Sequence, residues 1–440
     1  MRKEKSFKLD NIAQFKSKLL YWANQFNVFT HLDSNNYYKQ HHSHFFYNTY
    51  NSITAIGSIN NLETQYGNNF NQLKSYIDNN NNDWIFGHLS YDLKNETENL
   101  SSNNYDGIEF PVMHFYIPKY IFEIDNEILK VIYDSENNSE IEIDKLINEI
   151  KEFKPISFSI KNKIESKSRI TKNEYLQIVK NLLNEIHYGN IYEVNYCNEF
   201  YAEKAKIDAV KTYLNLQKIS PTPFSGLYKL ENKYLISASP ERFLKKTGQK
   251  VISQPIKGTI QRGITKNEDL ALAEFLKRNP KERAENTMIV DLVRNDLSKH
   301  AVKGSVKVNE YCGIYPFSHV HQMISTISAR IKENAHPANI IKDAFPMGSM
   351  TGAPKVKAME LIEKYEKIKR GLYSGSIGYF TPDNDFDFNV IIRSILYNQQ
   401  NNYLNFIVGS AITANSIPEL EYQECLVKAK AMQECLSAQF

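Results

Sequence analysis

The segment 171–196 predicts an amphipathic helix followed directly by a strand. A chain that contains both elements in succession cannot fold as an all-helical or an all-strand protein. Thr171 and Glu174 have the spacing of a capping box, and apolar residues then recur with a helical period up to Ile186. The Gly-Asn pair at 189–190 ends the helix, and the run Ile-Tyr-Glu-Val-Asn-Tyr that follows predicts a strand. Helices and strands then alternate to the end, without a repeat of about 20–50 residues. The sequence therefore predicts a body that mixes helices with strands.

The length and composition of the chain allow a large core and exclude several classes of protein. The 440 residues suggest about two to three units, or one large intertwined unit. A hydrophobic content of 42% is enough to fill a sizeable core. Because 53 basic and 50 acidic residues leave a net charge of only +3, we expect neither nucleic-acid nor membrane binding. No window reaches the ~18 apolar residues of a membrane helix, and we expect no signal peptide.

The composition divides the chain into an N-terminal region over 1–150, a polar and basic linker over 151–169, and a further region over 170–433. In the N-terminal region, the apolar run 84–91 predicts a buried strand. Two strand-like runs on either side of an Asp-Asn pair predict a hairpin over 121–133.

The histidines and cysteines give little support for a metal site or a disulfide framework. His41, His42 and His44 are close in sequence, but adjacent side chains point in different directions, so a metal role is disfavoured. The cysteines lack the spacing of metal ligands or of a disulfide framework: Cys197, Cys312, Cys425 and Cys435. We therefore expect reduced thiols and a cytoplasmic location.

Two pairs of glutamates, each three residues apart, are candidates for a metal site. Glu282 and Glu285 open a predicted helix after Pro280, and Glu421 and Glu424 open a second one. Such residues share a helical face, where two like charges are unfavourable without a nearby cation. Four carboxylates together would suit Mg²⁺, whereas the alternative is two solvated helix faces. Behind the first pair, a buried polar network is expected from Asp291, Arg294, Asn295 and Asp296.

Three further segments could bind an anionic group. Small residues over 348–353 lead into Pro354 at a helix start, where N–H groups favour an anion, although the P-loop spacing is absent. Arg393 lies in an apolar run that predicts a strand, so it needs a partner such as a substrate carboxylate. The predicted strand 403–411 ends in small residues. For the first segment, an ordinary capped helix remains the alternative.

Lys257 is a candidate nucleophile. It follows a predicted hairpin, in the sequence Gln-Pro-Ile-Lys-Gly-Thr, and Glu241 lies near the end of the first strand-like run. A lysine beside a glycine in a closed site can act as a nucleophile once its pKa is lowered. The alternative is a surface lysine beside a turn, which is the commoner place for a lysine.

Taken in order, these motifs resemble those of the chorismate-utilising enzymes. The resemblance is dense over 170–433 and looser before residue 150, where 32–34 and 86–93 look similar. The matching stretches are 189–195, 239–243, 255–259, 282–286, 291–297, 304–306, 348–355, 375–379 and 421–424. The resemblance implies an α+β fold with two packed antiparallel β-sheets, flanking helices and an interwoven N-terminal region.

The resemblance also implies a site. It implies Mg²⁺ between the ring carboxylate of chorismate and the glutamate pairs, with Glu285 and Glu424 as direct ligands. Glu282 and Glu421 would act close by or through water. Substrate contacts are implied for Asn195, Thr259, Thr351, Tyr373, Arg393 and Gly409.

The residue at position 257 separates reactions within this family. Anthranilate synthases usually carry alanine there, whereas aminodeoxychorismate synthases carry lysine, as here. The implied reaction is a transaminase-class amination in 4-aminobenzoate and folate biosynthesis. The Lys257 amine attacks ring C2, Glu241 protonates the departing 4-hydroxyl group, and ammonia then adds at C4 and expels the lysine.

Two positions depart from the family pattern. Glu193 stands where most of these synthases have glutamine, and where isochorismate and salicylate synthases have a lysine that activates water. Gln322 replaces a histidine associated with pyruvate elimination in anthranilate synthases, which favours a product that keeps its enolpyruvyl group. Anthranilate synthase component I and a non-catalytic chorismate-binding subunit remain the alternatives.

The source of ammonia is expected to lie outside this sequence. It lacks the Gly-x-Cys-x-Gly turn of a glutaminase nucleophile. Ammonia would therefore come from solution or from a separate glutamine amidotransferase subunit, which the resemblance implies as a partner.

Overall fold

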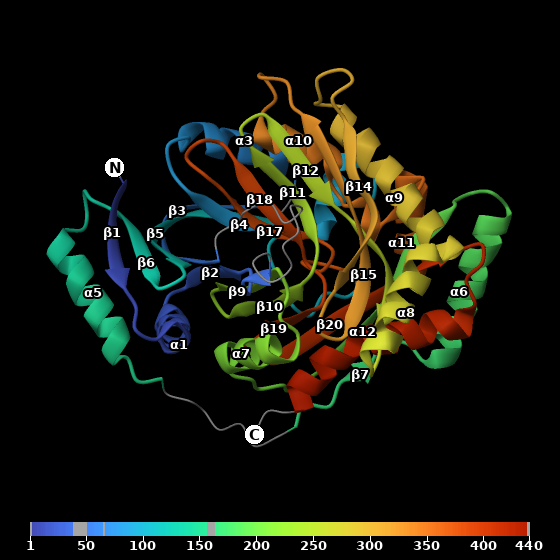
Figure 1. Ribbon diagram of the computed structural model, residues 1–440, viewed down its shortest axis with the longest axis horizontal. Coiled ribbons are helices and arrows are strands. Elements are labelled where there is room, and N and C mark those ends of the chain that lie inside the picture. The colour runs from blue at the N-terminus through green and yellow to red at the C-terminus, as the bar shows by residue number, and fades with distance from the viewer. Residues whose placement is uncertain (1, 38–50, 65–66, 156–162, 438–440) are drawn as a thin grey trace.

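Two long paired strands, β3 (Ser52–Thr64) and β5 (Met113–Asp125), join the two halves of an antiparallel sheet (Figure 1). The structure is a computed structural model that describes residues 2–37, 51–64, 67–155 and 163–437. Across these ranges, the strands hydrogen-bond into a single network. The start of β5 pairs with β4 (Ile85–Leu89) and its end with β6 (Ile128–Asp134), so the β3–β5 ribbon belongs to both halves.

The first half of the sheet contains strands from both ends of the chain. In hydrogen-bonded order it runs through β1 (Arg2–Lys8), β6, β5, β3, β2 (Val28–Asp33), β9 (Phe224–Leu230), β10 (Lys233–Ser239), β19 (Ser394–Asn398), β20 (Tyr403–Thr413) and β8 (Glu193–Ala202). The short strands β7 (Lys167–Ser168) and β16 (Gly352–Ala353) also pair with β8.

The second half carries the strand on which Lys257 lies. It continues from β4 through β17 (Ser376–Phe380), β18 (Phe386–Val390), β11 (Arg242–Thr247), β12 (Lys250–Gln254) and β15 (Val320–Arg330). Strands β13 (Ile256–Gln261) and β14 (Lys307–Pro316) both pair with β15. A continuous hydrophobic core contains side chains from both halves, such as Leu235 of the first and Phe388 of the second.

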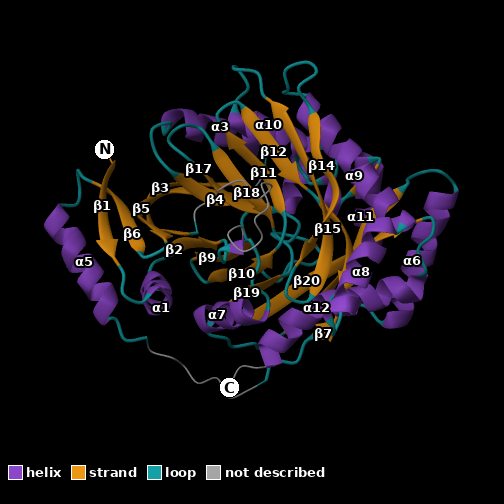
Figure 2. Cartoon of the chain, viewed as in Figure 1, coloured by secondary structure: helices purple, strands orange, loops and turns teal. Residues whose placement is uncertain are grey.

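Helices cover the outer faces of this sheet (Figure 2). Those packed around the first half are α1 (Ile12–Ala23), α5 (Glu140–Glu152), α6 (Lys172–His187), α7 (Ala209–Ile219), α11 (Lys355–Tyr365) and α12 (Pro418–Ser437). Those on the second half and its ends are α3 (Asn69–Asn79), α8 (Lys266–Arg278), α9 (Pro280–Ser298) and α10 (Pro337–Ala344). The predicted α+β fold is confirmed, and so is the interwoven N-terminal region, because β2 pairs with β9 and β4 pairs with β17.

Several local predictions can be compared with this arrangement. The helix after Thr171 is α6, and both capping-box hydrogen bonds are formed. The predicted hairpin over 121–133 is β5–β6. In the predicted linker 151–169, α5 extends to Glu152 and β7 pairs with β8, while residues 156–162 lie outside the described residues. His41, His42 and His44 also lie outside the described residues.

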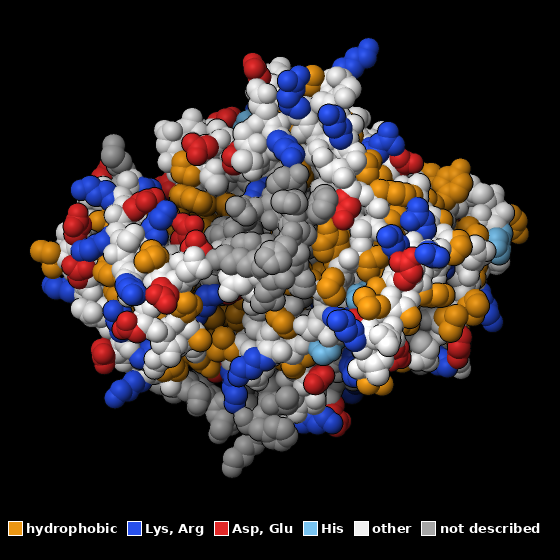
Figure 3. All heavy atoms as spheres, in the orientation of Figure 1, with side chains coloured by type: hydrophobic (Ala, Val, Ile, Leu, Met, Phe, Trp, Pro, Cys, Tyr) orange, Lys and Arg blue, Asp and Glu red, His pale blue; other side chains and the backbone are white. Residues whose placement is uncertain are grey.

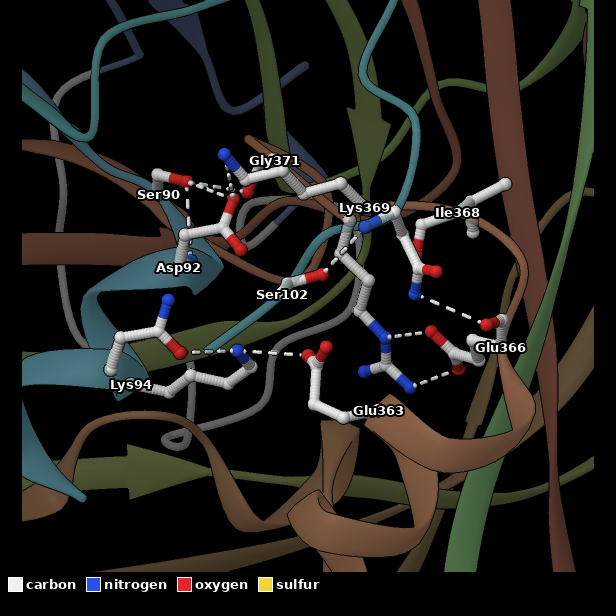
Figure 4. Close-up of polar contacts among 12 residues, drawn as sticks. Ser90, Asp92, Lys94, Ser102, Glu363, Glu366, Ile368, Lys369 and Gly371 are labelled. Atoms are coloured by element: carbon white, nitrogen blue, oxygen red, sulfur yellow. Dashed lines mark hydrogen bonds and ion pairs between the residues drawn. The ribbon is translucent and has the colours of Figure 1, made fainter. Parts of the chain in front are cut away.

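A buried polar cluster fixes the N-terminal region against the connection between α11 and β17 (Figure 4). Lys94 of the short helix α4 (Lys94–Thr97) is fully buried, and its ammonium lies 2.8 Å from the carboxylate of Glu363 on α11. The Ser90 hydroxyl donates a 2.8 Å hydrogen bond to the carbonyl of Gly371. Because a buried charge needs a partner, Lys94 ties the two regions together.

The surface carries charges of both signs, and the cysteines form no disulfide. Acidic and basic side chains are interspersed over the face drawn in Figure 3. The four cysteines are buried and free. In the part of the chain that the structure describes, no helix combines the length and the apolar character needed to span a membrane.

Candidate active site

A pocket of about 110 Å³ is walled by residues from β8, β13, β20, α9 and α12. All of the predicted site residues except Thr351 and Glu421 line it, namely Asn195, Glu241, Lys257, Thr259, Glu282, Glu285, Tyr373, Arg393, Gly409 and Glu424. Positions that are more than 200 residues apart in the sequence, such as Asn195 and Glu424, therefore contribute to one cavity.

Thr351 and Glu421 lie behind this wall. Thr351 is fully buried, and its carbonyl accepts a 2.8 Å hydrogen bond from the backbone N–H of Asn195. Thr351 thus supports Asn195, a residue that does line the pocket, and is not itself among the lining residues. Glu421 is also buried, and one of its carboxylate oxygens lies 3.1 Å from the ammonium of Lys281.

Lys257 lies on β13 with only 8% of its side chain exposed, so the surface alternative is wrong. The strand-like run 234–243 is interrupted at Pro240 and Glu241, and the hairpin that precedes Lys257 is β11–β12. The ammonium of Lys257 donates a 2.5 Å hydrogen bond to the carboxylate of Glu193 on β8.

The charges around Lys257 favour its protonated form. Burial alone would lower the pKa of Lys257, but the nearby carboxylates of Glu193, Glu285 and Glu241 outweigh burial and raise it. The surroundings of Lys257 therefore do not supply the lowered pKa that would make a lysine nucleophilic by itself. A lysine in this state must lose a proton before its nitrogen can attack a carbon atom.

Glu241 lies in the connection between β10 and β11, where its carboxyl group accepts a 2.6 Å hydrogen bond from the hydroxyl of Ser349. Burial raises the pKa of Glu241 to about 7, although Ser349 and Lys257 act in the opposite direction. A carboxyl group that is protonated in about half of the molecules at pH 7 can act as a general acid.

The glutamate pairs open two helices that face the same pocket. Asn279 caps α9 by accepting hydrogen bonds from the backbone N–H groups of Lys281 and Glu282, which fixes the start of the helix. Burial raises the pKa of Glu285 to about 8. Burial also opposes ionisation of Glu424, but the ammonium of Lys428 outweighs it and lowers the pKa of that carboxyl group.

The oxygens of these pairs fit a hard cation in their chemistry. Glu285 and Glu421 each have one buried carboxylate oxygen without a hydrogen-bond partner. The ammonium of Lys281 lies 3.1 Å from Glu421 and 3.8 Å from Glu285, so a side-chain cation already stands between the two helices. Among the described residues, no three His, Cys, Asp or Glu side chains are grouped closely enough to hold an ion. The carboxylate oxygens are therefore of the kind that Mg²⁺ prefers. In this structure, however, the ammonium of Lys281 is the cation that lies near Glu421 and Glu285.

Arg393 lines the same pocket and could donate hydrogen bonds to an anion there. Arg393 was predicted in a strand, but it lies in the connection between β18 and β19 with a left-handed backbone, φ 51°. Its guanidinium forms no side-chain hydrogen bond or ion pair with the residues that the structure describes, and burial lowers its pKa. Lys428 donates a 2.8 Å hydrogen bond to the carbonyl of Gly409. A half-buried guanidinium without a protein partner is suited to a carboxylate of the substrate.

Three polar residues of the pocket were missed by the sequence predictions: Lys281, Ser349 and Lys428. Lys281 lies four residues before Glu285, and Lys428 lies four residues after Glu424. This spacing places each lysine on the face of its glutamate, and it could have indicated both.

A buried arginine supports the pocket from behind. Arg370 donates hydrogen bonds to both carboxylate oxygens of Glu366, at 2.7 and 3.0 Å. It also donates to the carbonyls of Met350, at 2.7 Å, and of Asn195, at 2.8 Å, and both of these residues line the pocket. Arg370 and Glu366 thus set the position of two segments of the pocket wall, and neither was predicted.

The polar network expected behind the first glutamate pair is only partly present. Asp296 is buried, and its carboxylate accepts a 2.8 Å hydrogen bond from the ammonium of Lys355 at the start of α11. Asp291 and Arg294 form an exposed ion pair instead, and Asn295 is exposed.

Comparisons with known proteins agree with this geometry. The family described as chorismate binding enzyme matches residues 25–434. The chain is 33% identical over 360 residues to aminodeoxychorismate synthase component 1 of Bacillus subtilis, covering 80% of this chain and 76% of the relative. It is 33% identical over 352 residues to anthranilate synthase component 1 of Saccharolobus solfataricus, with 80% of each covered.

Two further matches differ in coverage. The chain is 40% identical over 289 residues to a probable chloroplastic aminodeoxychorismate synthase of Oryza sativa, covering 63% of this chain but only 32% of that longer relative. The crystal structure of anthranilate synthase component I from Streptococcus pneumoniae superposes with a TM-score of 0.76 at 26% identity, covering 87% of this chain and 91% of that one.

Proposed function

The chain belongs to the chorismate binding enzymes, and from this premise we propose that it converts chorismate and ammonia into 4-amino-4-deoxychorismate. It would serve as the aminating subunit of an aminodeoxychorismate synthase, in the route to 4-aminobenzoate and folate. The observation that favours this reaction over anthranilate formation is the buried Lys257 in the pocket wall, with Glu241 in the same wall.

The side chains of the pocket would divide the chemistry between them. The amine of Lys257 attacks ring C2 and forms a C–N bond, while the C4–O bond breaks. Glu241 gives its proton to the departing oxygen, which leaves as water. Ammonia then forms a bond to C4 as the bond from C2 to Lys257 breaks, which frees the lysine for another turnover.

The remaining residues would bind and orient the substrate. Arg393, with no protein partner among the described residues, would take the enolpyruvyl carboxylate together with Tyr373 and the backbone at Gly409. Asn195 and Thr259 also line the cavity.

Magnesium would be held on the side of the glutamate pairs, by Glu282, Glu285, Glu421 and Glu424. When bound, Mg²⁺ would neutralise the ring carboxylate and anchor the ring. The two buried oxygens of Glu285 and Glu421 that lack a hydrogen-bond partner support this assignment.

The ammonia would come from solution or from a glutamine amidotransferase subunit, and the enzyme would be cytoplasmic. Its four buried free cysteines are consistent with a reducing compartment. Adding the separate amidotransferase with glutamine should replace the requirement for ammonium.

A product assay tests the proposal. The protein is incubated with chorismate, Mg²⁺ and ammonium, and a lyase is added to half of each sample. We expect 4-aminobenzoate only where the lyase is present. Direct appearance of fluorescent anthranilate would assign the chain to anthranilate synthase instead, and absence of turnover would favour a non-catalytic chorismate-binding subunit.

A further inference from the structure

The carboxylate of Glu193 is the closest charged group to the reacting nitrogen of Lys257. Its oxygen Oε1 lies 2.5 Å from Nζ, and the side chain of Glu193 is completely shielded from solvent. The second oxygen, Oε2, is buried and has no hydrogen-bond partner. Glu193 therefore directs its hydrogen bonding to Lys257 and retains a vacant acceptor position in the same carboxylate.

The backbone holds Glu193 firmly in this position. It pairs with Thr413 of β20 on one side and with Ala353 of β16 on the other. Gly352 approaches so closely that a Cβ atom there would lie 2.1 Å from the carbonyl oxygen of Glu193. These neighbouring strands fix the backbone of Glu193, and its fully buried side chain places the carboxylate against Lys257.

The other carboxylates that face Lys257 have different surroundings. They are Glu241 from the β10–β11 connection, Glu285 from α9 and Glu424 from α12. In the described structure none of them comes within 4 Å of the Lys257 ammonium, whereas Glu193 does. Under the proposed function, Glu241 must enter the reaction with a proton of its own, and Glu285 and Glu424 would hold Mg²⁺. Glu193 is the group left to receive a proton from Lys257.

We propose that Glu193 takes the proton of the Lys257 ammonium when the amine attacks the ring, and returns it when the lysine is released. This inference rests on the proposed function. An N–H bond of Lys257 breaks and an O–H bond forms on Glu193, so the neutral amine can form its bond to C2. When ammonia displaces the lysine, the amine leaves neutral and recovers the proton from Glu193.

The inference predicts a different pH dependence for a variant that cannot accept a proton. In Glu193→Gln, the proton of Lys257 must leave to solvent. At pH values below the pKa of the lysine, the fraction of neutral, reactive amine therefore rises about tenfold for each unit of increase in pH. In the wild type, the transfer is internal to the pair. The ratio of kcat for Glu193→Gln to kcat for the wild type should therefore rise from pH 6.5 to pH 9, by about tenfold or more. Effects of Glu241 cancel in this ratio.

Two further measurements complete the test. Glu193→Asp keeps a carboxylate and should follow the wild-type pH profile even if its rate is lower. Intact mass after mixing with chorismate, without ammonia, should show an adduct on Lys257 that forms more slowly at pH 6.5 in Glu193→Gln than in the wild type. Circular dichroism would verify that both variants are folded.

The outcomes separate this inference from the proposed function. A ratio that does not change with pH, in an active wild type, would overturn the role of Glu193 alone. A wild type that makes no 4-amino-4-deoxychorismate at any pH would overturn the proposed function and this role together.

Discussion

Replacement of Arg370 by methionine should destabilise the whole protein, because it leaves the buried carboxylate of Glu366 without its cation. The two side chains are each about 1% exposed, and the Arg370 guanidinium also serves the carbonyls of Met350 and Asn195. Removing one partner of such a pair costs about 3–5 kcal/mol, and methionine approximates the length of arginine without its charge.

The expected change in melting temperature follows from the size of the chain. At about 2.1 cal/mol/K per residue, the 440 residues give an unfolding entropy of roughly 0.9 kcal/mol/K. A loss of about 4 kcal/mol therefore lowers Tm by about 4 °C. Calorimetry without chorismate or Mg²⁺ would measure this shift free of ligand stabilisation.

A matched control is the exposed ion pair between Arg294 and Asp291, which has a comparable N–O distance of 2.6 Å. The side chains of this pair are 53% and 60% exposed, so Arg294→Met should cost less than about 1 kcal/mol and shift Tm by about 1 °C or less. Equal shifts for the two variants, or a shift below 1 °C for Arg370→Met, would refute the view that burial gives the Arg370 pair its importance.

Three further predictions concern the chemistry. Lys257→Ala should give no mass adduct with chorismate and no 4-amino-4-deoxychorismate, and product formed at the wild-type rate would contradict its role as nucleophile. Because Glu241 has a pKa of about 7 and must be protonated to act, kcat/KM should fall about tenfold per pH unit above that value; a profile that stays level to pH 9 would rule it out as the acid. Removal of Mg²⁺ with a chelator should abolish activity and added Mg²⁺ should restore it, whereas Glu285→Gln should raise the Mg²⁺ concentration needed by about tenfold or more; titration of activity against Mg²⁺ measures both.

Local patterns in the sequence were sufficient to predict the helices that carry the glutamate pairs. Pro280 at the first turn of α9 and the glutamate spacing are local signals, and both helices are where they were predicted. The identity of most pocket residues came from the resemblance to a family, because no local pattern relates Asn195 to Glu424.

The conformation of Arg393 could not be predicted in this way. The residues around it are apolar and favour a strand, but the left-handed turn at Arg393 separates β18 from β19. That turn depends on the pairing of β18 with β11 and β17 and of β19 with β10 and β20, which are contacts distant in sequence.

The electrostatic state of Lys257 was also beyond local patterns. Its partner Glu193 lies 64 residues earlier, on a strand of the other half of the sheet. The residues next to Lys257 in sequence do not indicate the direction of its pKa shift, whereas the carboxylates brought together by the fold raise its pKa. The sign of the shift is therefore a property of the tertiary structure.

The pairing of β4 with β17 has a consequence for the synthesis of this protein on the ribosome. Ile85 pairs with Phe380, so β4 emerges about 300 residues before the strand that will cover one of its edges. At about 5–20 residues per second, this delay is roughly 15–60 s. During that time the apolar segment Ile-Phe-Gly-His-Leu exposes an unpaired edge to other nascent chains. Slower translation would lengthen this exposure, and we expect the yield of folded protein to depend on chaperones that shield the N-terminal strands until the last third of the chain has been made.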